Sequence, residues 1–152
     1  MRRVNAFDLL ADRIADGLLD RTLPKARWTH EGHLLACISL VRRFGAVEAL
    51  AIVRAAIPLY NEATGVANTP TSGYHDTITV YYVWAIDRLV ADGLGPAGIL
   101  RNERVARTAL LAWWDRETLM SPTARAGWLA PTSVVDGGPA PKEWLQSELT
   151  MV

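Results

Sequence analysis

The chain has 152 residues and a formal net charge of zero, because 16 Lys and Arg residues balance 16 Asp and Glu residues. This balance excludes the bulk electrostatic attraction by which strongly basic proteins bind nucleic acids or anionic membranes. Half of the residues are apolar, which predicts a folded domain with a sizeable core. A single cysteine, Cys37, excludes an internal disulfide framework.

The first residues lack the apolar stretch of a signal peptide, and Asp8, Asp12 and Asp16 interrupt the segment. The most apolar run, residues 78–86, is too short to span a bilayer. We therefore expect a cytoplasmic protein that acts on a small molecule and has neither a nucleic-acid nor a membrane partner.

Apolar residues recur at helical spacing along most of the chain. The first stripe, residues 7–18, predicts a helix, and the following segment, residues 22–27, contains Pro24 and is predicted to be a linker. A second helix is predicted between Thr29, a favourable N-cap, and Gly45, a typical terminator.

A third helix is predicted from Val47 to Gly65, with a kink at Pro58 because proline lacks a backbone N–H and clashes with the preceding turn. Residues 66–74 read VANTPTSGY, a composition typical of a loop. The next segment, residues 75–90, is rich in residues that favour strands, but its apolar residues recur at helical spacing, so we predict a helix.

A fifth helix is predicted over residues 99–119, with Trp113 among its core residues, and a short helix is expected to begin after Ser121. These elements predict a single helical domain over residues 1–130, followed by an extended C-terminal arm over residues 131–152. The fold class is therefore predicted to be all-α, a compact bundle of about five helices.

All three histidines lie at predicted helix starts. His30 and His33 fall in one turn, and their separation of three residues puts them on the face that continues into the core stripe. His75 opens the fourth predicted helix. Three inward imidazoles could hold one transition metal and leave a position open for water or substrate. Zn is the first expectation, and Fe, Cu or Ni is the redox alternative.

Other interpretations compete with a metal centre. Each histidine could be a core residue with a hydrogen-bond partner, or could line an apolar pocket without a metal. The commoner helical chelate, with histidines four residues apart, is absent from the sequence. The positive end of a helix dipole also opposes a cation and favours an anionic substrate.

Carboxylates stand next to these histidines. Glu31 follows His30, Asp76 follows His75, and Glu62 lies at the end of the third predicted helix. Each carboxylate could be a fourth metal ligand, a partner that orients an imidazole or a general base. The competing interpretation of Glu31 and Asp76 is that the helix dipole favours acidic residues in a first turn.

Candidate substrate-binding residues surround the histidines in the sequence. Asn68 and Thr69 in the polar loop could bind polar substrate groups, although such side chains also form turns and cap helices. Tyr74 is a candidate proton donor or pocket wall, and Trp28 and Tyr82 are candidate aromatic walls.

Two further patterns have a structural interpretation. Arg101, Arg104 and Arg107 are predicted to form a solvated face, with phosphate or carboxylate binding as the alternative. Cys37 is predicted to be a small buried residue, with a nucleophile activated by His33 as the alternative.

Several short blocks resemble a family of small, uncharacterised bacterial helical proteins over roughly residues 28–128. The blocks are residues 28–33 (WTHEGH), 60–62 (YNE), 68–69 (NT), 73–77 (GYHDT) and 121–125 (SPTAR), together with Trp128. That family has no established activity, so the resemblance implies only that these blocks belong together and carries over no reaction.

Three functions are consistent with the sequence. The first is a metalloenzyme in which His30, His33 and His75 hold one metal ion that acts on a carbonyl-bearing or anionic small molecule. The second is a metal-free binding protein or acid/base enzyme with a pocket lined by His, Tyr and Trp. The third is a non-catalytic module whose C-terminal arm, through a short helix around Trp144 and Leu145, clasps a second copy.

Overall fold

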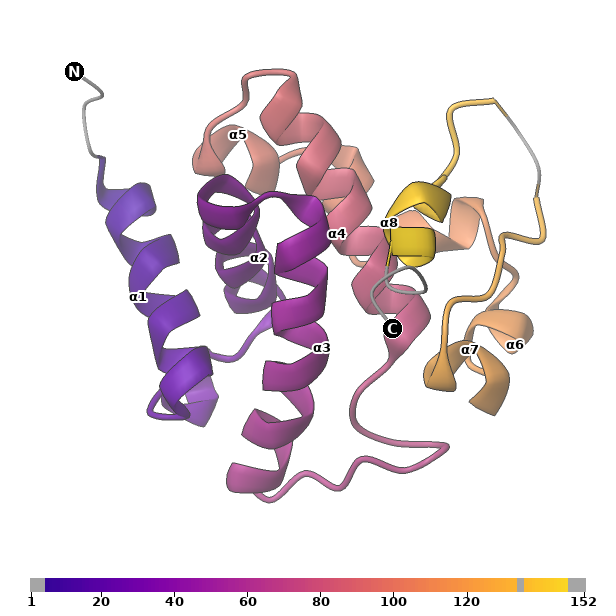
Figure 1. Ribbon diagram of the computed structural model, residues 1–152, viewed down its shortest axis with the longest axis horizontal. Coiled ribbons are helices and arrows are strands. Elements are labelled where there is room, and N and C mark those ends of the chain that lie inside the picture. Colours follow the sequence, from indigo (N-terminus) through magenta and orange to yellow (C-terminus); the bar gives the residue numbers. More distant parts are fainter. Residues whose placement is uncertain (1–4, 134–135, 148–152) are drawn as a thin grey trace.

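The computed structural model describes residues 5–133 and 136–147. Its long helices are α1 (Ala6–Asp20), α2 (His30–Phe44), α3 (Ala46–Ala63) and α4 (Asp76–Ala91). These helices stand side by side, and the short helices α6 (Arg116–Leu119), α7 (Pro122–Ala126) and α8 (Lys142–Ser147) lie beyond α4, whereas the short helix α5 (Pro96–Leu100) lies near α1 and α2 (Figure 1). The described residues contain no strand, only an isolated bridge between Thr69 and Ser72. For these residues the predicted all-α class is confirmed.

The α2 helix lies at the centre and contacts α1, α3 and α4. All residues from Leu34 to Val41 are buried, because neighbours cover this helix on several sides. The predicted caps are confirmed. The Thr29 hydroxyl accepts a hydrogen bond from the Gly32 backbone N–H at 3.1 Å, and Gly45 ends the helix with a φ of 82°.

The start of α2 is held against the segment that precedes it. A Cβ at Gly32 would lie 2.3 Å from the carbonyl oxygen of Arg27, which ends the 3-10 turn η1 (Lys25–Arg27), so only glycine allows this approach. From α3, the Tyr60 hydroxyl donates to the Leu23 carbonyl at 2.8 Å. These contacts determine where the first turn of α2 lies.

The predicted helix over residues 75–90 is confirmed as α4. Its β-branched residues do not prevent helix formation, because Val80, Val83 and Ile86 are fully buried in the core and packing outweighs their weak strand preference. The α3 helix continues through Pro58 and ends at Ala63.

The prediction of one helix over residues 99–119 is wrong. This region forms separate short elements: α5 (Pro96–Leu100), η2 (Glu103–Val105), η3 (Ala109–Ala112) and α6 (Arg116–Leu119). Asn102 and Asp115 divide the region, because their side chains accept hydrogen bonds from backbone N–H groups two and three residues later, at 3.0 and 2.9 Å. Such local bonds compete with a continuous helix.

Because the region is not one continuous helix, Trp114 is the buried core residue in place of the predicted Trp113. Trp114 is 1% exposed, whereas the predicted core residue Trp113 is only half-buried. The Trp114 indole donates to the Leu129 carbonyl at 3.0 Å, so the segment after α7 (Pro122–Ala126) is tied to the core.

The helix predicted around Trp144 and Leu145 is confirmed as α8 (Lys142–Ser147). Both side chains are half-buried against the core of the same chain. Of the predicted arm, residues 134–135 and 148–152 lie outside the described residues. Among the described helices, none is both long and apolar enough to cross a membrane.

Candidate functional site

A cavity of about 330 Å³, the α2 pocket, lies beside the first turns of α2. Residues of α2, α3 and α4 form most of its wall. The lining residues are Leu18, Trp28, Thr29, His30, His33, Leu34, Ala36, Cys37, Val53, Ile57, Ile78, Thr79, Tyr82 and Arg107. Four residues predicted for the site, Trp28, His30, His33 and Tyr82, therefore lie together.

His30 connects the α2 pocket to the segment after α5. Its Nε2 lies 2.9 Å from the Val105 carbonyl oxygen, and because a carbonyl only accepts, Nε2 carries the proton and donates. The imidazole meets the Tyr82 ring edge-on, with 5.4 Å between the ring centroids.

His33 lies in the same wall but is bonded differently. Its Nδ1 donates to the Thr29 carbonyl at 2.7 Å, which leaves a lone pair on Nε2 in the neutral ring. The imidazole stacks on the Trp28 indole with 3.6 Å between centroids. Nε2 has no hydrogen-bond partner within the described part of the chain, so it is free to accept a proton or a hydrogen bond.

The surroundings of His33 favour its neutral form. Although the residue is exposed, nearby protein atoms desolvate the ring and lower its pKa, more than the hydrogen bond to Thr29 raises it, and His30 lowers the pKa further. The lowered pKa leaves His33 with an unprotonated Nε2 at neutral pH.

Two hydroxyl groups of the α2 pocket donate to backbone carbonyls, whereas the Thr29 hydroxyl accepts from the Gly32 backbone N–H. Thr79 donates to His75 at 2.8 Å, and Tyr82 donates to Ala106 at 3.0 Å. Arg107 is exposed and lines the same pocket, although the sequence predicted a solvated face for it. The sequence offered anion binding by this arginine only as an alternative, and its place in the pocket depends on the broken path of residues 99–119.

Cys37 is buried in the wall, one turn after His33 on α2. Burial raises the pKa of its thiol to about 12. The thiol is therefore protonated at neutral pH and acts as a small apolar wall residue. This agrees with the predicted buried role and disfavours the alternative of an activated nucleophile.

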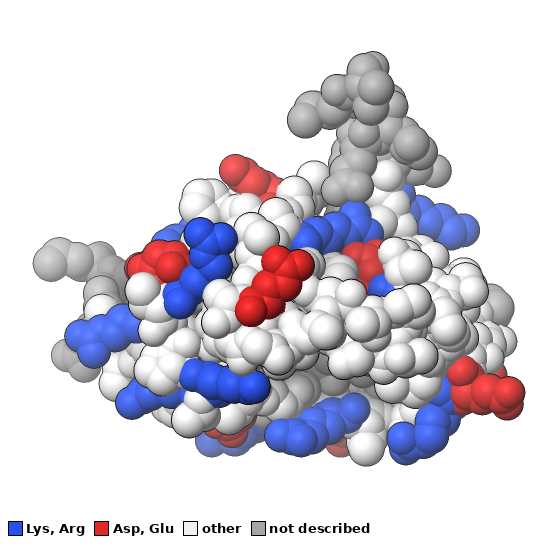
Figure 2. Space-filling view, turned by 90° about the horizontal axis from the view of Figure 1, so that it is seen from below, with Lys and Arg blue, Asp and Glu red and all other residues white. Residues whose placement is uncertain are grey.

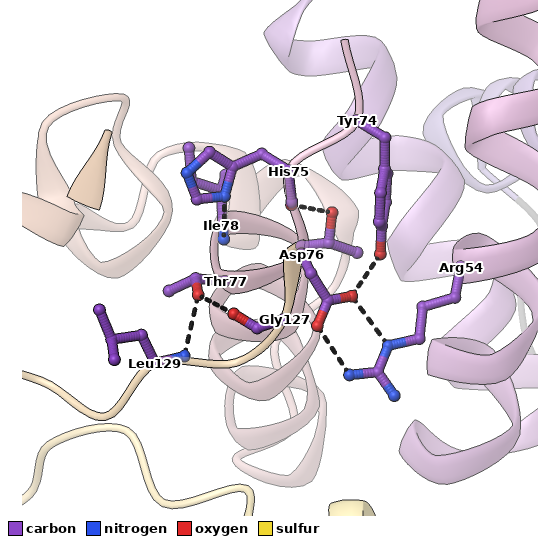
Figure 3. A network of polar contacts seen from close by, with 9 residues as sticks. Arg54, Tyr74, His75, Asp76, Thr77, Ile78, Gly127 and Leu129 are labelled. Carbon is purple, nitrogen blue, oxygen red and sulfur yellow. Dashed lines mark hydrogen bonds and ion pairs between the residues drawn. The ribbon is translucent and has the colours of Figure 1, made fainter. Parts of the chain in front are cut away.

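His75 is not among the lining residues of the α2 pocket. Its ring lies at the start of α4 (Figure 3). Its Nδ1 accepts a hydrogen bond from the Ile78 backbone N–H at 3.2 Å, and its Nε2 donates to the Leu119 carbonyl at 2.7 Å. Both ring nitrogens are engaged, so His75 is the N-cap of α4 and a link to α6.

Asp76 is part of a buried ion pair. Its carboxylate receives two hydrogen bonds of 2.9 Å from Arg54 of α3 and one of 2.7 Å from the Tyr74 hydroxyl (Figure 3). Burial raises the pKa of Tyr74, and the Asp76 charge raises it further. Neither Tyr74 nor Asp76 lines the α2 pocket, so their predicted catalytic roles have no support from the geometry.

The structure thus brings together two of the three predicted metal ligands. His30 and His33 share a pocket, whereas His75 is directed to Leu119. Within residues 5–133 and 136–147, no group of three or more His, Cys, Asp or Glu is placed to hold a metal ion. A three-histidine Zn, Fe, Cu or Ni centre stays a prediction whose ligand set is not assembled in the described residues.

The remaining predicted residues lie outside the α2 pocket. Glu31 and Glu62 are both exposed, and neither lines it. Asn68 shapes the loop, because its Oδ1 accepts from the Tyr74 backbone N–H at 3.0 Å and its Nδ2 donates to the Pro58 carbonyl at 3.0 Å.

Thr69 pairs with Ser72 across the same loop. Asn68, Thr69 and Tyr74 line a second hollow of about 410 Å³ that shares no lining residue with the α2 pocket. The sequence predicted that these residues belong to one site, but the structure places them at two separate hollows.

Charged side chains are mixed over the surface. On the face in Figure 2, Lys and Arg stand among Asp and Glu around a broad area without charge. This face shows no extended region of one sign.

Comparisons with known proteins found no relatives: no family model, curated protein or solved structure matches the chain. The predicted resemblance to a bacterial family therefore stays a prediction, and function is inferred from the site.

Proposed function

We propose that the chain binds a small, largely apolar organic molecule in the α2 pocket. The observation that carries this proposal is the convergence of Trp28, His30, His33 and Tyr82 on one cavity of about 330 Å³. Small-molecule sites are typically cavities of about 300–1,000 Å³ with apolar walls and a few well-placed polar groups. The α2 pocket matches this description.

The wall of the pocket is held in place before any ligand binds. The Trp28 indole stacks on His33 and meets Tyr60 edge-on, with 5.3 Å between the centroids of the second pair. Tyr82 is held by His30 and by its hydrogen bond to Ala106. A wall that is ordered in the free protein reduces the entropy lost on binding.

A metal-free acid/base reaction is the second candidate, and one observation favours it. His33 Nε2 has a lone pair and no partner among the described residues, and the lowered pKa keeps this nitrogen unprotonated. A general base needs such a nitrogen within reach of the substrate. If the bound molecule is a substrate, His33 is the residue that takes its proton.

The other two hypotheses lack a comparable observation. A three-histidine centre requires His75 to release the hydrogen bond at the nitrogen that binds the metal, and His75 does not line the pocket of His30 and His33. A clasp between copies requires apolar residues of the arm to be available, but Trp144 and Leu145 already pack against the core of their own chain.

The proposal is tested by titration with N-phenyl-1-naphthylamine, a neutral apolar dye whose fluorescence rises in apolar surroundings. We expect saturable binding to the full chain. The Ile57→Trp variant fills the pocket and should abolish the signal. Ile52→Trp is the matched control, because Ile52 is also a half-buried residue of α3 but does not line the pocket.

Circular dichroism of both variants shows whether they remain folded. Absence of saturable binding to the unmodified chain would contradict the proposal. Equal binding by a folded Ile57→Trp variant would do so as well, because the dye would then sit elsewhere.

A further inference from the structure

The α2 pocket has charged groups of only one sign in its lining. Its lining residues include no Asp or Glu. Arg107 carries a full positive charge in this lining. A cavity with this charge pattern attracts a negatively charged group and disfavours a cation.

Arg107 has no ion-pair partner within residues 5–133 and 136–147. The ion pairs that the structure shows there are Arg42–Asp8, Arg43–Asp16 and Arg54–Asp76. Arg107 lines the pocket together with Tyr82, whose hydroxyl donates to the carbonyl of Ala106, the residue before Arg107. An arginine at a pocket edge without a carboxylate partner is available to a ligand.

Most other donors of the lining are already used. The hydroxyl groups of Thr79 and Tyr82 donate to backbone carbonyls, and the imidazoles of His30 and His33 donate to Val105 and Thr29. The Thr29 hydroxyl accepts from the Gly32 backbone N–H and can itself donate only one neutral hydrogen bond. The guanidinium of Arg107 is therefore the charged donor group of the lining for a polar atom of the ligand. A planar guanidinium matches the two oxygens of one carboxylate.

We propose that the ligand of the α2 pocket is a monocarboxylate with an apolar body, and that its carboxylate binds Arg107. This inference rests on the proposed function, because it specifies the chemistry of the molecule bound there. A phosphate would carry more charge and more acceptor atoms than one guanidinium satisfies, and the rest of the lining is mainly apolar.

The test compares 3-phenylpropionate with 3-phenylpropionamide, which has nearly the same shape but no charge. Each compound is titrated against the full chain loaded with N-phenyl-1-naphthylamine, at pH 7 and low salt. We expect the carboxylate to displace the dye at a concentration lower than the amide by a factor of about five or more.

Arg107→Gln should reduce this preference to about twofold or less, with the displacement by each compound measured relative to the dye affinity of that variant. The matched control is Arg104→Gln, which removes the same charge from an exposed residue of the same segment that does not line the α2 pocket. It should keep the preference for the carboxylate.

The outcomes separate the two proposals. If the dye binds but the carboxylate and amide displace it equally, or neither displaces it, the carboxylate inference is wrong and the pocket remains. The inference is also wrong if Arg107→Gln keeps the full preference or Arg104→Gln removes it. If neither the dye nor either compound binds, the proposed function itself fails.

Discussion

The imidazole of His75 donates a hydrogen bond to the backbone carbonyl of Leu119, 2.7 Å away. The other ring nitrogen accepts from the Ile78 backbone N–H, so a single buried side chain caps α4 and holds the end of α6. A residue that the sequence placed in a metal centre thus has a structural role. The same ring would have to lose the bond at one of these nitrogens before that nitrogen could bind a metal.

His75→Ala should lower the free energy of unfolding by about 2–4 kcal/mol, because it removes an N-cap and leaves the buried carbonyl of Leu119 without its donor. His75→Asn retains a side-chain acceptor for the cap and should cost less. Urea unfolding followed by circular dichroism measures both changes. A loss below about 0.5 kcal/mol for His75→Ala would contradict this role.

Stability should also depend on pH through His75. Burial lowers the pKa of this imidazole, more than the hydrogen bond to Leu119 raises it, and the Arg125 charge lowers the pKa further. The unfolded chain, with an ordinary histidine pKa near ~6.5, therefore binds more protons than the folded chain as the pH falls through this value. The stabilisation is complete above that pH and is lost progressively below it.

Unfolding experiments at pH 7.5 and 5.5 test this expectation. The free energy of unfolding should fall on acidification, and the fall should be smaller in His75→Asn. The difference between the two proteins isolates His75 from His33, whose pKa is also lowered. An identical fall in both proteins would show that other groups cause the pH dependence.

Removal of the Asp76 charge should lower the free energy of unfolding, with little change in dye binding to the α2 pocket. Asp76→Asn leaves Arg54 without its buried carboxylate partner, which should cost about 3 kcal/mol. Tyr74→Phe removes only one hydrogen bond and should cost about 1 kcal/mol. Glu62→Gln, at an exposed position, is the control and should change stability by less than about 0.5 kcal/mol.

Thermal and urea unfolding, with dye titration on the folded variants, provide the measurements. A catalytic or ligand-binding Asp76 would instead give a stable Asp76→Asn protein with altered binding, and that result would refute the structural role.

Elemental analysis of protein purified without an affinity tag tests the three-histidine centre. We expect Zn, Fe, Cu and Ni each below about 0.2 equivalents and no uptake on titration, because His75 Nδ1 and Nε2 both have protein partners. One equivalent of a metal that is lost in His75→Asn would show that the ring leaves these partners, and would restore the metalloenzyme hypothesis.

Much of the local structure was predictable because it depends on residues within one or two turns. The Thr29 cap, the break at Gly45 and the polar loop over residues 66–74 follow from side chains that bond to nearby backbone groups. The spacing of His30 and His33 by three residues also determines that both face the same side of α2.

The partners of these side chains were not predictable in the same way. His75 could face a metal or a carbonyl, and the choice depends on Leu119, 44 residues away. The sequence allowed Asp76 to be a base or an ion-pair partner. In the structure it pairs with Arg54, which belongs to a different helix.

The sequence by itself determined the helical class, the ends of α2 and the common face of His30 and His33, since periodicity and capping act over a few residues. Only the tertiary structure decided that Arg107 reaches the α2 pocket and that His75 does not line it. The physical reason is that buried polar groups take whichever partner the packed chain brings within hydrogen-bond distance. That partner depends on the path of distant segments, such as the broken stretch over residues 99–119.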